Sequence, residues 1–283
     1  MHTTLIDVHT LNRHHQDPDW RVIDARFSLA DAGQGAREYG EGHVPGAVYA
    51  HLDDDLSGPI VRGVTGRHPL PSVERATEIF SQFGIDESMQ VAVYDGAGGS
   101  VAARVWWMLR WLGHDAVAVL DGGWPAWTGA GLPVTRDVPG VGPRTFVPNV
   151  RAHLVTDVEG VDRHRKDETW AVLDARTPER FRGEQEPIDP VAGHIPGATC
   201  ATFDANLGED GCFRSPEELR RRFEGLFGGV PVDHAINYCG SGVSACHNLL
   251  AIAHAGLGDA VLYPGSWSEW ITDEDRPIGA GEG

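Results

Sequence analysis

Cysteine is scarce in this sequence, and its few cysteines do not form a recognisable framework. The 283 residues contain four of them, Cys200, Cys212, Cys239 and Cys246. No two are spaced as Cys-x-x-Cys, so the sequence predicts no structural zinc site and no bound metal. A chain of this length can bury a sizeable core without disulfides, and free thiols are therefore expected.

Long apolar runs and an excess of positive charge are also missing. No stretch approaches the roughly 18 apolar residues of a membrane helix, and residues 1–15 lack the apolar segment of a secretory signal. Lys and Arg number 23 against 41 Asp and Glu, which gives a formal net charge of -18. Because phosphate groups are bound by clustered Lys and Arg, we expect neither nucleic acid nor a membrane as a partner. A cytoplasmic location with reduced thiols is the expectation.

An internal repeat indicates two homologous domains. Four blocks recur in the same order and at a nearly constant spacing. They are Trp20–Arg26 with Trp170–Arg176, His43–Ala47 with His194–Ala198, Gln90–Asp95 with His234–Cys239, and Trp124–Trp127 with Trp267–Trp270. The period is far too long for a solenoid. Residues 137–149 are rich in Pro and Gly, so we predict a linker there, between domains at 1–136 and 150–283.

Each half alternates short apolar runs with helical patterns. The runs predict buried strands at 21–24, 91–94, 116–120, 171–174, 235–238 and 260–263. Helices are predicted at 73–83, 100–112, 216–227 and 243–254, with Ser72 and Ser215 as N-caps and Pro216 at a first helical position. Such alternation predicts, in each half, a mostly parallel sheet flanked by helices. The expected fold class is therefore α/β, in two tandem domains.

Cys239 stands between a predicted buried strand and a predicted helix. In open α/β sheets, chemistry gathers at the carboxyl ends of the strands. The loop Cys239-Gly-Ser-Gly-Val-Ser-Ala245 can turn several backbone N–H groups toward one anion, and the helix N-terminus adds its positive end. Gly240 and Gly242 allow the backbone conformations that this requires. The pattern is typical of a reactive thiolate, although a buried cysteine with a structural role would fit the same residues.

These motifs resemble the rhodanese family, specifically its tandem-domain thiosulfate and 3-mercaptopyruvate sulfurtransferases. The likeness covers nearly the whole chain, through the two Asp-Ala-Arg blocks, Gly193–Ala198, Gly122-Gly-Trp124 and Gly265-Ser-Trp267. The neutral Gly-Ser after Cys239 looks like the mercaptopyruvate type, since the thiosulfate type usually has basic residues there. The resemblance implies that Cys239 is the nucleophile, that it carries sulfur as a persulfide, and that no cofactor is needed.

Asp95 is the residue of the first half that matches Cys239. A carboxylate cannot form a persulfide, so the first half resembles the inactive partner domain of the family. One active site per chain follows, in the C-terminal domain.

The resemblance also implies substrate-binding residues. Arg180 matches a family arginine that binds the donor's carboxylate or sulfonate, and its guanidinium fork suits either group. Arg182 is a weaker candidate for the same role. The loop residues assigned to donor or persulfide binding are Gly240, Gly242, Val243 and Ser244.

One departure from the family pattern bears on the donor. The mercaptopyruvate enzymes typically place a second arginine shortly after a Glu-Pro pair, whereas Glu186-Pro187-Ile188 is followed here by Asp189. Asp189 therefore weighs against mercaptopyruvate, while the neutral loop favours it.

A proton-relay array is the last implied feature. His68, in Gly66-Arg-His-Pro-Leu70, and Asp53 match the first-domain members of a proposed Ser–His–Asp array, and Ser241 supplies the hydroxyl. Such an array could deliver a proton to the enolate that leaves when sulfur is taken from mercaptopyruvate. A loop histidine and a solvated acidic turn are the alternatives for His68 and Asp53.

A phosphatase and a non-catalytic sulfur-relay or regulatory module are the alternatives to a sulfurtransferase. Phosphatases with a related fold need Cys-x5-Arg to hold a phosphate, and the sixth residue after Cys239 is Ala245. A non-catalytic sulfur-relay or regulatory module would have less need for the intact cysteine loop. The expected reaction is ping-pong transfer of sulfur from a small-molecule donor, 3-mercaptopyruvate or alternatively thiosulfate, to cyanide or to a thiol acceptor such as thioredoxin.

Overall fold

The chain forms two compact units in the computed structural model, which describes residues 1–282. The first unit comprises residues 1–58, 70–151 and 209–212, and the second comprises 59–69, 152–208 and 213–283. Each unit thus takes one short loop from the other half of the sequence. The predicted linker, 137–149, lies within the first unit. No helix among residues 1–282 is long and apolar enough to cross a membrane.

The first unit is built on a parallel sheet with the strand order β1-β5-β4-β2-β3. The strands are β1 (Leu5–Ile6), β2 (Trp20–Asp24), β3 (Val48–Tyr49), β4 (Gln90–Tyr94) and β5 (Val117–Leu120). The helices are α1 (Val8–His14), α2 (Gln34–Glu41), α3 (Val73–Gln82), α4 (Ala102–Trp111) and α5 (Gly123–Gly129). Leu11 of α1 and Trp127 of α5 share one core cluster with residues of β2, β4 and β5.

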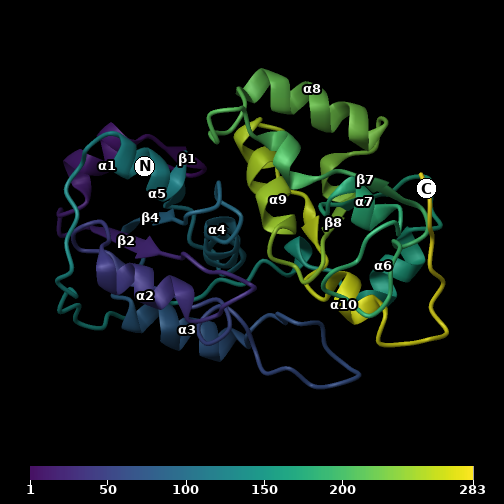
Figure 1. Cartoon of the computed structure of the whole chain (residues 1–283), viewed down its shortest axis with the longest axis horizontal. Helices are drawn as coiled ribbons and strands as arrows, with labels where there is room; N and C mark the ends of the chain where they lie inside the picture. The colour runs from purple at the N-terminus through teal and green to yellow at the C-terminus, as the bar shows by residue number, and fades with distance from the viewer. Residues whose placement is uncertain (283) are drawn as a thin grey trace. The chain divides into compact units, whose positions relative to one another are not determined.

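The second unit repeats this plan with the strand order β7-β6-β8-β9, again parallel. The strands are β6 (Ala171–Asp174), β7 (Ala198–Cys200), β8 (Ala235–Tyr238) and β9 (Val261–Leu262). The α-helices are α6 (Val158–His164), α7 (Pro178–Phe181), α8 (Pro216–Phe227), α9 (Ala245–His254) and α10 (Ser266–Trp270), with short 3-10 turns at Ala152–Leu154, Phe203–Asn206 and Val232–His234. Figure 1 shows β8 between α9 on one side and α6 and α7 on the other.

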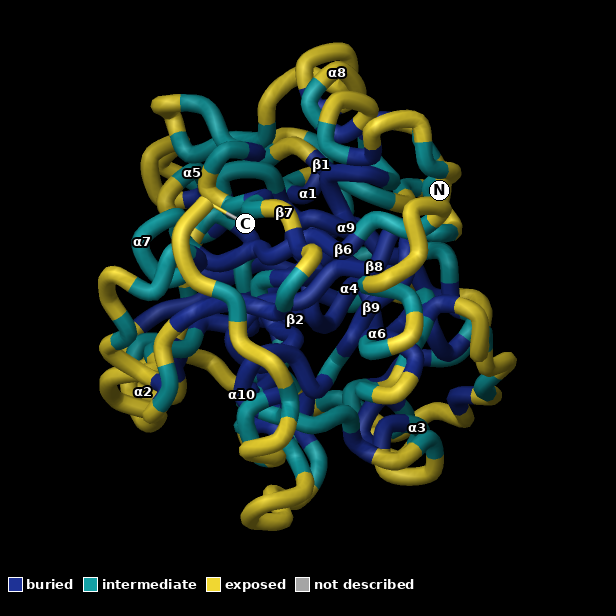
Figure 2. The backbone as a smooth tube through the Cα atoms, turned by 90° about the vertical axis from the view of Figure 1, so that its right-hand side faces the viewer, coloured by how far each residue is buried: buried dark blue, intermediate teal, exposed yellow. Residues whose placement is uncertain are grey.

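Helices on both faces bury the strands, and this explains why the strands are largely apolar. In Figure 2 the strands β2, β6, β8 and β9 are mostly dark blue, while the outer turns of α3 and α8 are largely exposed. Every residue of β4, β5 and β8 is buried. The α/β class and the two similar domains that the sequence predicts are confirmed, with all six predicted strands present.

Local signals set the helix boundaries. The Ser72 hydroxyl accepts a hydrogen bond from the Arg75 N–H at the start of α3. Ser215 and Glu218 form a reciprocal capping box at the start of α8, where Pro216 occupies the first turn. Both predicted N-caps are confirmed. In contrast, α4 and α9 begin two residues later than predicted, because the preceding residues turn around Asp95 and Cys239.

Candidate active site

Cys239 follows β8 directly, at the carboxyl end of the central strand pair of the second unit. Its side chain is buried, with 2% of the residue exposed. The N–H of Gly242 donates to the Cys239 sulfur at 3.1 Å. Within residues 1–282, the N–H groups of Ser241, Val243 and Ser244 have no hydrogen-bond acceptor. The sulfur thus accepts one backbone hydrogen bond, and the same loop has further backbone donors with which it could bind an anion.

Gly242 is required by the close packing of this loop. Its φ angle is 76°, in the region that side chains rarely adopt. A Cβ at this position would lie 2.3 Å from the Pro264 carbonyl oxygen. No other residue fits without moving the backbone that carries Cys239.

Ser266 braces Cys239 from the opposite side, and the sequence reasoning did not identify it. Its hydroxyl accepts a hydrogen bond from the Cys239 N–H at 3.1 Å and donates to the Tyr263 carbonyl at 2.9 Å. With φ at 56°, it is the one non-glycine residue among those described that has a positive φ. Strained residues of this kind gather at functional sites. The signal for it was the Gly265-Ser-Trp267 block after β9, which matches Gly122-Gly-Trp124 of the first half.

Residues 59–69 bring His68 to the Cys239 loop. At Gly66, a Cβ would lie 2.5 Å from the Gly265 carbonyl oxygen, so the two backbones pack directly. The Arg67 N–H donates to the Ser268 hydroxyl at 3.0 Å. His68 Nδ1 and Ser241 Oγ are 2.7 Å apart, and both residues are buried. The predicted pair of His68 and Ser241 is therefore in contact within the second unit.

Asp53 lies in the first unit, on an exposed turn. Its backbone N–H donates to His51 Nδ1 at 3.3 Å. Its membership of the proton-relay array stays a prediction.

Arg180 lies beside the Cys239 loop at the end of α7. A Cβ on Gly240 would be 3.5 Å from its Nη2 and 3.6 Å from its Nη1. Glu186 holds the guanidinium through Nε at 3.1 Å and Nη2 at 2.8 Å. Burial alone would raise the pKa of Glu186, but the hydrogen bonds from Arg180 and from the Asp189 N–H leave it lowered. Arg180 is thus fixed in orientation next to Gly240, the residue that follows Cys239.

Arg182 points elsewhere. Its Nε and Nη2 each donate to Glu184 at 2.9 Å. It lines a pocket of about 520 Å³ together with Cys200 and Arg222, and no residue of the Cys239 loop lines that pocket. The structure therefore does not bring Arg182 to the sulfur, although it lies only two residues from Arg180.

Arg67 is a second guanidinium at the site, and the sequence reasoning did not single it out. A Cβ on Gly240 would lie 2.8 Å from its Nη2. Its Nη1 is ion-paired with Asp189, whose other oxygen accepts from Arg180 Nη2 at 3.0 Å. Burial raises the pKa of Asp189, while the charge of Arg67 opposes that rise. Spacing along the chain could not reveal this cluster, since Arg67 and Asp189 come from different halves.

The first unit has the same loop with a carboxylate in place of the thiol. Asp95 follows β4 and is 1% exposed. Its two oxygens accept hydrogen bonds of 2.8 to 2.9 Å from the backbone N–H groups of Ala97, Gly99, Val101 and Ala102. The repeat thus preserves a loop that binds an anion, and this copy is filled by its own side chain.

The repeated Asp-Ala-Arg blocks brace both loops. Arg26 and Arg176 each form a buried ion pair at 2.6 Å, with Asp24 and Asp174 respectively. The Trp124 N–H donates to the Asp95 carbonyl at 2.8 Å, as the Trp267 N–H does to Cys239 at 3.0 Å. These contacts occur in both halves, as a structural role requires.

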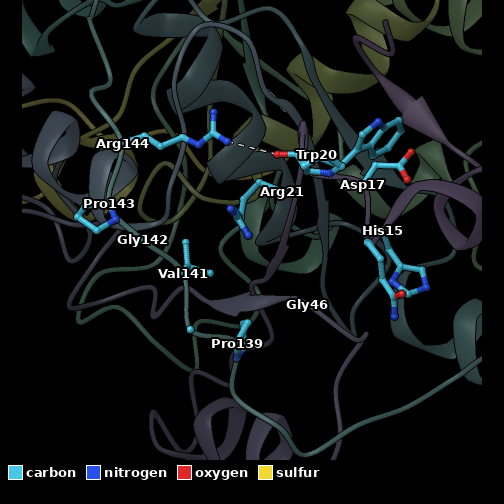
Figure 3. Close-up of a pocket in the computed structure, with 13 residues that line it drawn as sticks. His15, Asp17, Trp20, Arg21, Gly46, Pro139, Val141, Gly142, Pro143 and Arg144 are labelled. Atoms are coloured by element: carbon cyan, nitrogen blue, oxygen red, sulfur yellow. Dashed lines mark hydrogen bonds between the residues drawn. The ribbon is translucent and has the colours of Figure 1, made fainter.

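A pocket of about 630 Å³ in the first unit lies at the amino-terminal end of β2 (Figure 3). Trp20 and Arg21, at the beginning of β2, line it together with residues 139–144. Arg144 donates to the Pro18 carbonyl at 3.3 Å and is ion-paired with Asp86 at 2.7 Å. The pocket is at the amino-terminal end of the strand, away from the loop at the carboxyl end that holds Asp95.

Comparisons with known proteins agree with this architecture. The profile of the rhodanese-like domain matches twice, over residues 7–130 and 157–273. A protein of Pseudomonas aeruginosa named "Probable 3-mercaptopyruvate sulfurtransferase" is 50% identical over 267 residues, with 94% of each chain covered. A Mycobacterium tuberculosis relative whose name describes a thiosulfate sulfurtransferase, SseB, is 40% identical over 274 residues, covering 92% of this chain and 90% of its own. The crystal structure of SseA from Escherichia coli, described as a 3-mercaptopyruvate sulfotransferase, matches with a TM-score of 0.81 and 31% identity, covering 95% of this chain and all of its own.

Proposed function

The chain belongs to the rhodanese family and is a sulfurtransferase, and we propose that it takes sulfane sulfur from 3-mercaptopyruvate onto Cys239 and passes it to a thiol or to cyanide. The observation that carries the proposal is the buried Cys239 sulfur, which accepts a hydrogen bond from the Gly242 N–H, with Arg67 and Arg180 beside the adjacent Gly240. A cysteine in this position can act as a nucleophile toward an anionic donor that the two positive charges attract.

In the first half-reaction, the Cys239 thiolate attacks the donor sulfur. A sulfur–sulfur bond forms, the carbon–sulfur bond of the donor breaks, and its electron pair moves onto carbon to give the enolate of pyruvate. One proton then converts the enolate into pyruvate. The pair of His68 and Ser241, 2.7 Å apart, is suited to supply that proton.

In the second half-reaction, the acceptor attacks the outer sulfur of the Cys239 persulfide. Before that attack, the N–H groups of Ser241, Val243 and Ser244 would stabilise the persulfide anion. With cyanide, the products are thiocyanate and the free Cys239 thiolate, so charge and atoms balance. In a reducing cytoplasm, a dithiol protein such as thioredoxin is the acceptor that this chemistry suits.

Thiosulfate is the second candidate donor, favoured by one observation. The relative from Mycobacterium tuberculosis that is 40% identical is named for it. With this donor, sulfite leaves as a stable anion and needs no proton on carbon, so His68 would be dispensable.

Mass spectrometry after treatment with 3-mercaptopyruvate tests the proposal. We expect one added sulfur on Cys239, removable by cyanide, and none on Cys246. Cys239→Ser should carry none and have no turnover with either donor. Sulfur transfer that survives in Cys239→Ser would contradict the proposal, and side-by-side values of kcat/KM for the two donors would decide between them.

A further inference from the structure

Residues 59–69, from the other half of the sequence, place a second arginine, Arg67, beside Gly240 of the Cys239 loop. We propose that Arg67 and Arg180 together bind the anionic group of the donor, and that Asp189 is a resident carboxylate that competes with the donor for them. This inference rests on the proposed function, because it concerns the donor site of Cys239.

The two guanidinium groups converge on the residue next to the nucleophile. A Cβ on Gly240 would lie 2.8 Å from Arg67 Nη2, and 3.5 and 3.6 Å from Nη2 and Nη1 of Arg180. Gly240 has no side chain, so nothing of its own fills the space between them. An anion that approaches the Cys239 sulfur over Gly240 would meet both arginines.

Each arginine has N–H groups that neither Glu186 nor Asp189 binds. Glu186 and Asp189 bind Nε and Nη2 of Arg180, and within residues 1–282 its Nη1 has no hydrogen-bond partner. Asp189 binds Nη1 of Arg67, and the Nη2 of Arg67 faces Gly240. The buried Nε of Arg67 has no hydrogen-bond partner in the described part of the chain. Arginine donors presented in this way fit a carboxylate or a sulfonate.

Asp189 occupies the position in which a donor carboxylate would bind. Its side chain is 3% exposed, and its two oxygens bridge the two arginines, one oxygen to each. It belongs to residues 184–192, which form neither helix nor strand and can shift without breaking a ladder. A donor that binds the same two guanidiniums exchanges one carboxylate for another.

The charges of the cluster support competition. With both carboxylates ionised, Glu186 and Asp189 balance the two positive charges of Arg67 and Arg180, so the four side chains sum to zero. Replacing Asp189 by Asn leaves a net charge of one positive unit beside Gly240. That change favours binding of an anionic donor. Replacing Arg67 by Gln leaves a net charge of one negative unit instead, which disfavours that binding.

Steady-state kinetics with 3-mercaptopyruvate, and cyanide as acceptor, test both residues. We expect Arg67→Gln to raise the donor KM about 10- to 100-fold with a small change in kcat, since it removes a charged hydrogen bond. Arg67→Lys should restore part of the loss, because it restores the charge without the fork. Asp189→Asn should lower the donor KM several-fold. The KM for cyanide should not change in any of them.

Arg62→Gln is the matched control, since Arg62 is an exposed arginine of the same loop. It should behave like the unaltered chain. Equal donor KM values in Arg67→Gln and in the control would overturn the role of Arg67, as would a loss confined to kcat. A higher donor KM in Asp189→Asn would overturn the competition. Failure of the unaltered chain to turn over 3-mercaptopyruvate would instead contradict the proposed function.

Discussion

The loops after β4 and β8 have the same backbone construction, but the first holds a carboxylate, Asp95, where the second holds a thiol, Cys239. Asp95 receives four backbone hydrogen bonds on a side chain that cannot leave or react. Cys239 receives one at its sulfur, and the N–H groups of Ser241, Val243 and Ser244 donate to no acceptor among residues 1–282. The comparison teaches that the backbone of the loop can bind an anion in either half. Catalysis further requires that the side chain in the loop is a nucleophile and that some N–H groups remain available for the reacting group.

The largest expected effect comes from making the second loop like the first. Cys239→Asp should reduce sulfur transfer by about a thousandfold or more, because no nucleophile is left. The new carboxylate should accept the N–H groups as Asp95 does, so the thermal midpoint of unfolding should not fall. Activity assays and calorimetry would check both results. A strongly destabilised Cys239→Asp, next to an unaffected Cys239→Ser, would show that the two loops are not equivalent.

Removing His68 should separate the two donors. The equivalent of Ser241 in the first unit is Ala97, which has no hydroxyl to pair with a histidine. We expect His68→Ala to lower kcat/KM for 3-mercaptopyruvate about 100-fold, the usual worth of a positioned acid or base, and to affect thiosulfate far less. Ser241→Ala should produce the same pattern, and the double variant should lose little more. Equal losses with both donors would exclude the proton-relay role.

Removing the Asp95 carboxylate from the first loop should lower the stability of the fold and leave sulfur transfer unchanged. Asp95→Ala removes the acceptor of four backbone N–H groups, three of them in buried hydrogen bonds, which should cost about 3 kcal/mol or more in the free energy of unfolding. Cys239→Ala, which removes one acceptor, should cost about 1 kcal/mol. Denaturant titration would measure both. Similar costs would show that the carboxylate does not hold the first loop together.

The smallest expected effect concerns pH and is confined to the first unit. Hydrogen bonds from Ser88 and from Arg144 lower the pKa of Asp86 from 3.8 to about 2. A lowered pKa means that this stabilisation is complete above about pH 4 and is lost as the pH falls toward 2. Asp86 lies near the surface, so Asp86→Asn should cost less than about 1 kcal/mol at pH 7. The difference from the unaltered chain should shrink as the pH falls through 2 and vanish below it in acid-unfolding curves, and a constant difference would argue against ionisation as its cause.

Much of the architecture could be predicted, because strands buried on both faces and capped helices leave local signals. The apolar runs before Asp95 and Cys239, and the caps Ser72 and Ser215, depend only on nearby residues. Short edge strands such as β1 and β3 carry two residues each and leave no such pattern.

The parts of the site that escaped prediction depend on contacts across long separations. Arg67 reaches Asp189 over 122 positions, and Ser266 reaches Cys239 over 27. Neither Arg67 nor Ser266 lies in a periodic pattern. The left-handed backbone of Ser266 is also contrary to its own preference, so only the surrounding packing determines it.

The crossing of residues 59–69 into the second unit has a consequence for truncation. The first half of the sequence supplies His68 and Arg67, which lie against Ser241 and Gly240 of the second half. A gene that encodes only residues 150–283 would therefore produce Cys239 without either of these neighbours.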